Sequence, residues 1–414
     1  MNNADSDTNP DINANTNAQP ISTSTSVSTS TTPEFDVKGK ELALKGAIIS
    51  AEQGQQKAII DLLDKLLDTH CFDAVLIPVK VPAGDSFTYL LVQDRSILKD
   101  KGALPLPPIM SVQGGKALSS ITRTKQADSN IKIAAIMRPC EISAAIELAK
   151  LEQVDLTNLT LISMDCPGVL PMSDYIADPQ KGMDTFNTAM AEMNDDPMRP
   201  ICQICDKFGL ALGDLHIGTL GAEKGQIFVI PTSSTGNDII SALGLVADKS
   251  VNDWQVKVNE VTQTKQSKRD QVYQDLNSMV MGIDNLLDIF SQCINCHNCL
   301  RVCPICYCQQ CYFDSENFKY PPDDYLSRAE KAGSIRFPPD TLLYHVGRMM
   351  HMSYSCVACG CCEDACPVSI PVGQIYSMIG QKTQEIFDYV PGKEINVPRP
   401  LTTYIKEELQ EVED

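Results

Sequence analysis

The sequence predicts two folded domains of different class, a mixed α/β domain at residues 37–225 and a mainly α-helical domain at residues 285–385. Strand-like apolar runs alternate with helical segments in the first range, which is the pattern of layered α/β proteins. Two cysteine-rich runs joined by helical sequence mark the second range. Residues 1–36 are rich in Ser, Thr, Asn and Asp, so they bury too little apolar surface to offset the entropy of ordering, and we predict a disordered tail. A helical connector at 226–284 and an acidic tail at 386–414 complete the predicted organisation.

The elements of the α/β domain follow from its apolar periodicity. Helical spacing occurs at residues 58–67 and 142–151, and strand-like runs occur at 72–81, 88–92, 131–137 and 159–164. Cys140 lies shortly after the third of these strands, and Cys166 follows the fourth. Because open α/β sheets bind ligands beyond the carboxyl ends of their strands, both cysteines are candidate site residues.

The two cysteine runs of the helical domain share one spacing. The first extends from Cys293 to Cys303 and the second from Cys356 to Cys366, and both read C-x2-C-x2-C-x3-C-P. Bacterial-type ferredoxins hold 4Fe–4S clusters with this spacing, and in two-cluster ferredoxins the fourth cysteine of each run ligates the other cluster. This rule assigns one cluster to Cys293, Cys296, Cys299 and Cys366, and the other to Cys356, Cys359, Cys362 and Cys303.

A pair of structural zinc sites is the alternative, since C-x2-C pairs also suit zinc. A zinc site needs only four ligands. It does not explain why each run has a third cysteine at the same two-residue spacing, or why the fourth cysteine of each run is followed by proline. The spacer at residues 305–355 is much longer than in a small ferredoxin, and residues 339–352 have a helical pattern. We therefore expect a helical dicluster ferredoxin domain rather than a compact domain with β-strands.

A third group of cysteines lies outside the two runs. Its members each lie beside a proline, an acidic residue or a C-x2-C pair, and they are Cys140, Cys166, Cys202 and Cys205. Four thiolates from three loops would complete one more 4Fe–4S site. The alternative is that two of these cysteines are buried thiols and that the C-x2-C pair is unrelated to them. Spacing alone does not decide between this alternative and a 4Fe–4S site.

Charge and cysteine content exclude several classes of partner. The net charge of −19 argues against nucleic acid and anionic membrane as partners. No apolar stretch reaches the length that spans a bilayer, so we expect no membrane span. The chain has 17 cysteines and no signal-peptide pattern, which favours reduced, metal-bound cysteines in the cytoplasm.

Four short segments around the third group of cysteines resemble a known family. They are Arg138-Pro-Cys140-Glu, Asp165-Cys166-Pro-Gly168, Cys202-x2-Cys205-Asp and a following Gly-Asp-x-x-Ile-Gly. It is the beta-subunit family of the deazaflavin (F-420)-dependent hydrogenases and formate dehydrogenases. The paired runs resemble the C-terminal extension of formate dehydrogenase beta subunits and the helical ferredoxin of heterodisulfide reductase C subunits. The resemblance covers roughly residues 40–390.

This resemblance implies one 4Fe–4S cluster on the third group of cysteines, together with FAD. It also implies electron passage between a catalytic partner and a hydride carrier, a deazaflavin coenzyme or NAD(P). One departure concerns the family's early glycine pair, which should fall near residues 52–57, where only Gly54 stands. Gly114, Gly115 and Lys116, before a helix, are the substitute candidates for a phosphate-binding helix start.

We therefore expect an iron–sulfur subunit of an oxidoreductase. The sequence does not decide whether this subunit catalyses a reaction of its own. A formate dehydrogenase alpha-like partner is favoured over a hydrogenase or a heterodisulfide reductase. The alternatives are a flavin-free iron–sulfur relay, or a zinc-stabilised scaffold or redox sensor.

Several other side chains have a structural and a functional interpretation. For four further cysteines we favour buried thiols that tune the clusters over substitute ligands: Cys306, Cys308, Cys311 and Cys361. We expect Cys71 in the core and His297 facing solvent. Packing or an interface is favoured over a proton relay for His345, Arg348 and His351. Asp206 and Asp214 are equally suited to bonding a cofactor and to turns or caps.

Overall fold

The computed structural model describes residues 44–100, 102–124, 130–316, 321–334 and 340–401. All of them belong to one compact unit, Ala43–Asp414. The predicted disordered tail lies outside the described residues, as does the acidic tail beyond residue 401.

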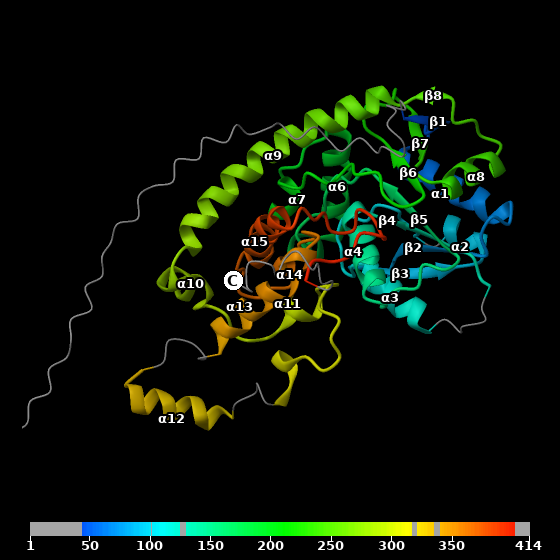
Figure 1. Cartoon of the computed structure of the whole chain (residues 1–414). Coiled ribbons are helices and arrows are strands. Elements are labelled where there is room, and N and C mark those ends of the chain that lie inside the picture. The colour runs from blue at the N-terminus through cyan, green and yellow to red at the C-terminus, as the bar shows by residue number, and fades with distance from the viewer. Residues whose placement is uncertain (1–43, 101, 125–129, 317–320, 335–339, 402–414) are drawn as a thin grey trace, which may run out of the picture. The chain divides into compact units, whose positions relative to one another are not determined.

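An eight-stranded mixed sheet forms the centre of the α/β region, with the strand order β3-β2-β4-β5-β6-β7-β1-β8 (Figure 1). Its strands are β1 (Lys45–Ser50), β2 (Ala74–Lys80), β3 (Phe87–Val92), β4 (Ile133–Met137), β5 (Leu159–Met164), β6 (Leu215–Gly218), β7 (Gln226–Pro231) and β8 (Lys249–Ser250). Strands β2, β4, β5 and β6 are parallel, whereas β3, β7, β1 and β8 pair antiparallel with their neighbours. The carboxyl ends of β4 and β5 therefore meet at one edge of the sheet, where Cys140 and Cys166 follow them.

The sheet extends beyond the boundary drawn from the sequence. Residues 226–250 contain β7 and β8 within the range assigned to a helical connector, and β7 is the strand that the apolar run at residues 227–230 predicts. Strand β7 lies between β6 and β1, so the chain returns to pair with the first strand of the region. Such pairing joins segments far apart in the sequence, and local apolar spacing does not reveal it.

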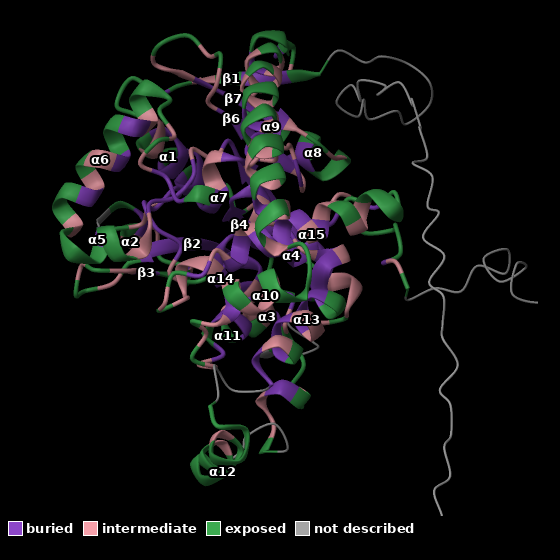
Figure 2. Cartoon of the chain, turned by 90° about the vertical axis from the view of Figure 1, so that its left-hand side faces the viewer, coloured by how far each residue is buried: buried purple, intermediate pink, exposed green. Residues whose placement is uncertain are grey.

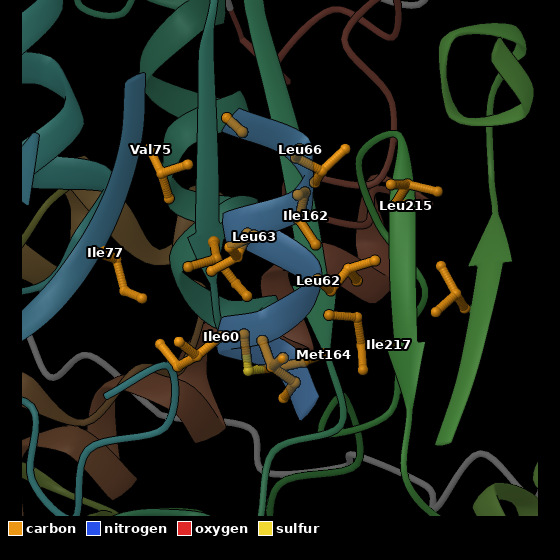
Figure 3. Packing of buried hydrophobic residues seen from close by; sticks show 14 of the residues in the cluster. Ile60, Leu62, Leu63, Leu66, Val75, Ile77, Ile162, Met164, Leu215 and Ile217 are labelled. Carbon is orange, nitrogen blue, oxygen red and sulfur yellow. The ribbon is translucent and has the colours of Figure 1, made fainter. Parts of the chain in front are cut away.

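Helices cover both faces of the sheet. They are α1 (Gln55–Asp68), α2 (Arg95–Asp100), α3 (Gly114–Thr124), α4 (Pro139–Lys150), α5 (Met172–Ala177), α6 (Pro179–Glu192), α7 (Pro200–Gln203) and α8 (Ser234–Ala242). Successive strand residues point to opposite faces, so Ile136 packs with α1 whereas Ala135 packs with α3 and α4. Figure 3 shows Leu62, Leu63 and Leu66 of α1 facing the strand residues Val75, Ile77, Ile162, Met164, Leu215 and Ile217. These two apolar layers confirm the α/β class predicted from the sequence.

A second core holds the helical region together. Its elements are α9 (Asn252–Val280), α10 (Ile283–Phe290), α11 (Asn298–Arg301), η1 (Tyr312–Asp314), α12 (Pro322–Ala332), α13 (Thr341–Met352), η3 (Ser353–Ser355), α14 (Cys361–Asp364) and α15 (Val372–Ile386). Apolar residues of α9, α10, α13 and α15 pack around the cysteine loops. Much of α9 is exposed and no residue of α12 is buried (Figure 2). The helical class predicted for this region is confirmed.

The sequence pattern predicts one long helix over residues 265–290 that leads into the first cysteine run, but the structure has two helices there. Helix α9 ends at Val280 and α10 begins at Ile283, with Gly282 between them at φ 92°. This left-handed conformation suits glycine and ends a right-handed helix. None of the described helices is both long and apolar enough to span a bilayer.

Candidate iron–sulfur centres

The two cysteine runs fold into loops with the same backbone course. Asn295 and His297, two and four residues after Cys293, have φ 51° and 58°. Ala358 and Gly360 occupy the same positions after Cys356, with φ 53° and 73°. Left-handed residues other than glycine are uncommon and cost about 1 kcal/mol. Their recurrence at matching positions indicates that the backbones of both cysteine loops follow the same curved course.

The thiols of the two loops form two groups, and each group includes the fourth cysteine of the other loop. Burial raises the pKa of the Cys293 thiol to about 11; the Asn295 N–H opposes this shift, and the thiols of Cys299, Cys296 and Cys366 add to it. Burial also raises the pKa of the Cys356 thiol to about 11, with Cys303 as an interacting thiol. Cys362 and Cys359 each interact with Cys303 as well. These interactions are those expected if the thiols that the spacing assigns to each cluster lie near one another, and the ligand assignment itself stays a prediction.

Helix α13 presents polar side chains to the first loop. The Tyr344 hydroxyl lies 3.2 Å from Cys299 Sγ, and His345 Nε2 lies 3.3 Å from Cys293 Sγ. The His345 ring stacks on Phe290 with 3.9 Å between ring centroids, and its Nδ1 lies 2.9 Å from the hydroxyl of Tyr376. Burial lowers the pKa of His345 to about 3. The packing predicted for this helix is thus present, and its polar atoms contact the predicted ligands.

Arg348, on the same helix, is a buried cation among thiols. It is 1% exposed, and Nη2 donates to the Cys299 carbonyl at 3.1 Å and to Cys306 Sγ at 3.6 Å. Its Nε and Nη1 are buried without a hydrogen-bond partner, and none of the carboxylates that the structure describes forms an ion pair with it. An uncompensated buried charge is costly. A 4Fe–4S cluster with four thiolates carries net negative charge, so this cation fits a cluster at the paired loops.

The third group of cysteines converges on one small cavity. Cys140 lies in the first turn of α4, Cys166 follows β5, and Cys202 and Cys205 belong to α7 and the residues after it. Residues lining the cavity include Cys140, Cys166, Cys202, Cys205, Arg138 and Arg199. Burial raises the pKa of Cys205 to about 12, with Asp206 and Cys202 adding to it. Four sulfurs and two buried guanidinium groups around one cavity fit an anionic four-thiolate cluster.

A buried polar network holds the loop that carries Cys166. The Asp165 carboxylate accepts from the Thr219 N–H at 2.7 Å, the Leu220 N–H at 3.1 Å and Trp254 Nε1 at 3.0 Å. His216 Nε2 lies 3.1 Å from Asp165 Oδ1, and its Nδ1 lies 2.7 Å from Ser163 Oγ. The sequence alone does not reveal this network, because the residues that bond to Asp165 come from two other segments, residues 216–220 and helix α9.

The third group lies directly against the second loop. Arg199 Nε donates to Cys202 Sγ at 3.3 Å, and its Nη1 donates to Asp364 at 3.0 Å. Its Nη2 donates to the carbonyl of Cys359. Ala358 and Cys359 also line the cavity of the third group. All three groups of cysteines therefore form one contiguous series within the compact unit.

Gly114, Gly115 and Lys116 begin helix α3, as expected, but their contacts do not fit a flavin phosphate. The Gly114 N–H donates to Glu141 Oε1 at 2.9 Å, so a carboxylate already lies at the helix start. A Cβ on Gly115 would lie 2.8 Å from the backbone nitrogen of Ala145 in α4. The Lys116 ammonium donates to the Arg301 carbonyl. These glycines permit close packing of α3 on α4, and FAD remains a prediction from the resemblance.

Three other residues considered in the sequence, His297, Asp206 and Asp214, contact neighbouring side chains or backbone of the fold. The prediction of a solvent-facing His297 is wrong: the residue is 9% exposed, because its ring stacks on Tyr344 with 4.4 Å between centroids. Asp206 pairs with Arg269, and Asp214 accepts from the Leu161 N–H and from Ser233.

The additional cysteines differ in their exposure. Cys361 is buried with its Sγ 3.3 Å from the sulfur of Met110, and Cys306 and Cys311 are half-buried. The prediction of a buried thiol is wrong for Cys308, which is exposed. Cys71 packs at the margin of the first core. Within the described part of the chain, no group of three or more His, Cys, Asp or Glu side chains is arranged to hold a single metal ion.

Comparisons with known proteins identify a matching domain and two similar chains. Residues 288–370 match the family model described as a 4Fe-4S dicluster domain. The F420-dependent formate dehydrogenase subunit beta of Methanocaldococcus jannaschii is 26% identical over 82% of this chain and 93% of its own length. The F420-dependent formate dehydrogenase 1 subunit beta of Methanococcus maripaludis is 28% identical over 83% of this chain and 92% of its own length.

Among solved structures, a chain of the F420-reducing [NiFe] hydrogenase complex from Methanosarcina barkeri covers 60% of this chain and 97% of its own length. Its sequence identity to this chain is 14% and its TM-score is 0.41. The chain is a homologue of the F420-dependent formate dehydrogenase beta subunits, with a 4Fe–4S dicluster domain toward its C-terminal end.

Proposed function

We propose that this chain is the electron-transfer subunit of a formate dehydrogenase-like complex. Three 4Fe–4S clusters would relay electrons between a catalytic partner subunit and a hydride carrier, a deazaflavin coenzyme or NAD(P). The similarity to two formate dehydrogenase beta subunits supports this role. The observation that carries the proposal is the position of the third group of cysteines, because Ala358 and Cys359 of the second loop line the same cavity.

The proposed ligands are the cysteines of the three groups. They are Cys293, Cys296, Cys299 and Cys366 for the first cluster, Cys356, Cys359, Cys362 and Cys303 for the second, and Cys140, Cys166, Cys202 and Cys205 for the third. Each cluster, when bound, supplies reversible transfer of one electron. The buried guanidinium groups of Arg348, Arg138 and Arg199 would balance the negative charge of the thiolates.

FAD next to the third cluster is part of the proposal on the resemblance alone, and no step is derived through it. A flavin-free relay is the second candidate, favoured by the carboxylate of Glu141 at the start of α3. The partner we favour is a formate dehydrogenase alpha-like subunit. We place the chain in the cytoplasm because so many reduced cysteines need a reducing compartment.

Anaerobic purification with iron, sulfide, zinc and flavin quantification tests the proposal. Three clusters predict about 12 irons and 12 sulfides per chain. Cys166→Ser should lower the iron content to about eight per chain. Cys71→Ser is the matched control and should leave the iron content unchanged, because Cys71 lies outside all three groups.

The other outcomes separate the candidates. About eight irons per chain in both the parent and Cys166→Ser would refute the third cluster. Stoichiometric zinc with negligible iron would refute electron transfer. Full iron with no flavin, under conditions in which formate still reduces the deazaflavin with the partner present, would favour the flavin-free relay.

A further inference from the structure

We propose that helix α13 raises the reduction potential of the cluster held by the first loop above that of its neighbour on the second loop. Tyr344 and His345 would do so by hydrogen bonds to two of its ligand sulfurs. This inference rests on the proposed function, because it requires the paired clusters. It goes further by giving two residues a role and by ranking the two clusters.

The direction of the hydrogen bonds follows from the chemistry of the sulfurs. A cysteine that binds iron is a thiolate, which has no proton and only accepts hydrogen bonds. Tyr344 must therefore donate its O–H to Cys299, 3.2 Å away, and His345 must donate from Nε2 to Cys293, 3.3 Å away. The stacking of the His345 ring on Phe290 and its bond to Tyr376 hold Nε2 toward the sulfur.

Such donors stabilise the reduced cluster more than the oxidised one. Reduction adds one electron, so the thiolate sulfurs become more negative and charge-assisted hydrogen bonds to them become stronger. Hydrogen bonds to the sulfurs are one of the means by which a protein sets the potential of an iron–sulfur cluster. Both residues therefore favour one-electron reduction of the cluster on the first loop.

The proposed ligands of the second cluster contact weaker side-chain donors. The side-chain contact of Cys303 is with the thiol of Cys306, and that of Cys359 is with the thiol of Cys361. A thiol is a weak donor compared with a phenol or an imidazole. Arg348 interacts with both Cys299 and Cys303, so its charge acts on both clusters and does not distinguish them. Arg199 donates to the carbonyl of Cys359 on the second loop, but its charge is balanced by Asp364 at 3.0 Å. The difference between the clusters thus comes from Tyr344 and His345.

The test is a redox titration of the anaerobic holoprotein, followed by the EPR signals of the reduced clusters. Tyr344→Phe removes the donor and keeps the ring. We expect one signal to move to lower potential, with about a tenfold change in the ratio of reduced to oxidised cluster, or about 59 mV for one electron. The Fe–S stretching frequencies in the resonance Raman spectrum should change in the same variant.

Tyr273→Phe is the matched control, because its hydroxyl donates to Ser377 Oγ at 2.8 Å and not to sulfur. It should leave all midpoint potentials unchanged. His345→Phe, which retains an aromatic ring against Phe290, is the second variant if Tyr344→Phe does not fold. It should also lower the potential of the same cluster.

The inference is overturned if full iron content accompanies unchanged potentials in the α13 variants, or if Tyr273→Phe produces the same shift. A parent protein without iron or reduced-cluster signals would instead refute the proposed function. The two failures are therefore distinguishable.

Discussion

Replacing Glu147 with glutamine should strongly destabilise the protein. Glu147 of α4 is fully buried, and its carboxylate accepts from Ser355 Oγ at 2.7 Å and from the Gly392 N–H at 2.9 Å. The ammonium of Lys150 lies 3.2 Å away, and Arg399 Nε lies 3.6 Å away. This network ties the helix that begins beside Cys140 to the residue before Cys356, so it joins the α/β region to the second loop.

The magnitude follows from burial of the partners. The side chain of Lys150 is 5% exposed, so its ammonium would remain buried without this counter-charge. Removing one partner of a buried ion pair costs about 3–5 kcal/mol. The glutamine amide would also present N–H to a group of donors, which leaves one of them unsatisfied. At about 2 °C per kcal/mol for a large domain, the melting temperature should fall by about 6–10 °C.

Thermal unfolding of the anaerobic holoprotein at one scan rate measures this effect. Glu260→Gln is the matched control, because Glu260 is 58% exposed and its pair with Lys257 lies at the surface. Its melting temperature should stay within about 1 °C of the parent, since exposed pairs contribute little. If Glu147→Gln also melts within about 1 °C of the parent, the buried network does not stabilise the protein and the reasoning is refuted.

Three further variants test separate contacts. Gly115→Ala should cost about 1–2 kcal/mol in a stability measurement, since its Cβ meets the backbone of α4, whereas Lys116→Ala should cost less than about 0.5 kcal/mol. Asp64→Asn should cost about 1 kcal/mol at pH 7. The bond from Arg95 holds the pKa of Asp64 well below its usual range, so this difference should begin to shrink as pH falls below about 4 and should vanish only when pH falls through the lowered pKa of the folded state. Asp165→Asn should lower the iron content by about four per chain, because its carboxylate holds the Cys166 loop.

Each of these variants has an outcome that contradicts its explanation. Loss of bound flavin in Gly115→Ala with unchanged stability would favour cofactor binding over helix packing. A pH-independent difference in Asp64→Asn would show that the ion pair is not responsible. Full iron in Asp165→Asn would show that the network does not position a ligand.

Local spacing predicted much of the fold because it reflects which residues one element buries. The strand expected at residues 159–164 is β5, and the apolar spacing at 58–67 lies within α1. Strand β1 was not predicted, because its pairing with β7 joins segments far apart in the chain. The helix break at Gly282 was also missed, because a lone glycine in a helical pattern does not reveal its φ angle.

The sequence by itself determined the chemistry of the paired loops, because the spacing of thiolates around a cluster is a local property of the backbone. Only the tertiary structure decided which side chains surround those thiolates. Tyr344, His345 and Arg348 are ordinary residues of an amphipathic helix until packing turns them toward Cys299 and Cys293. Likewise, packing placed Glu141 at the start of α3, and a glycine pair has no local signal that tells a helix contact from a phosphate site.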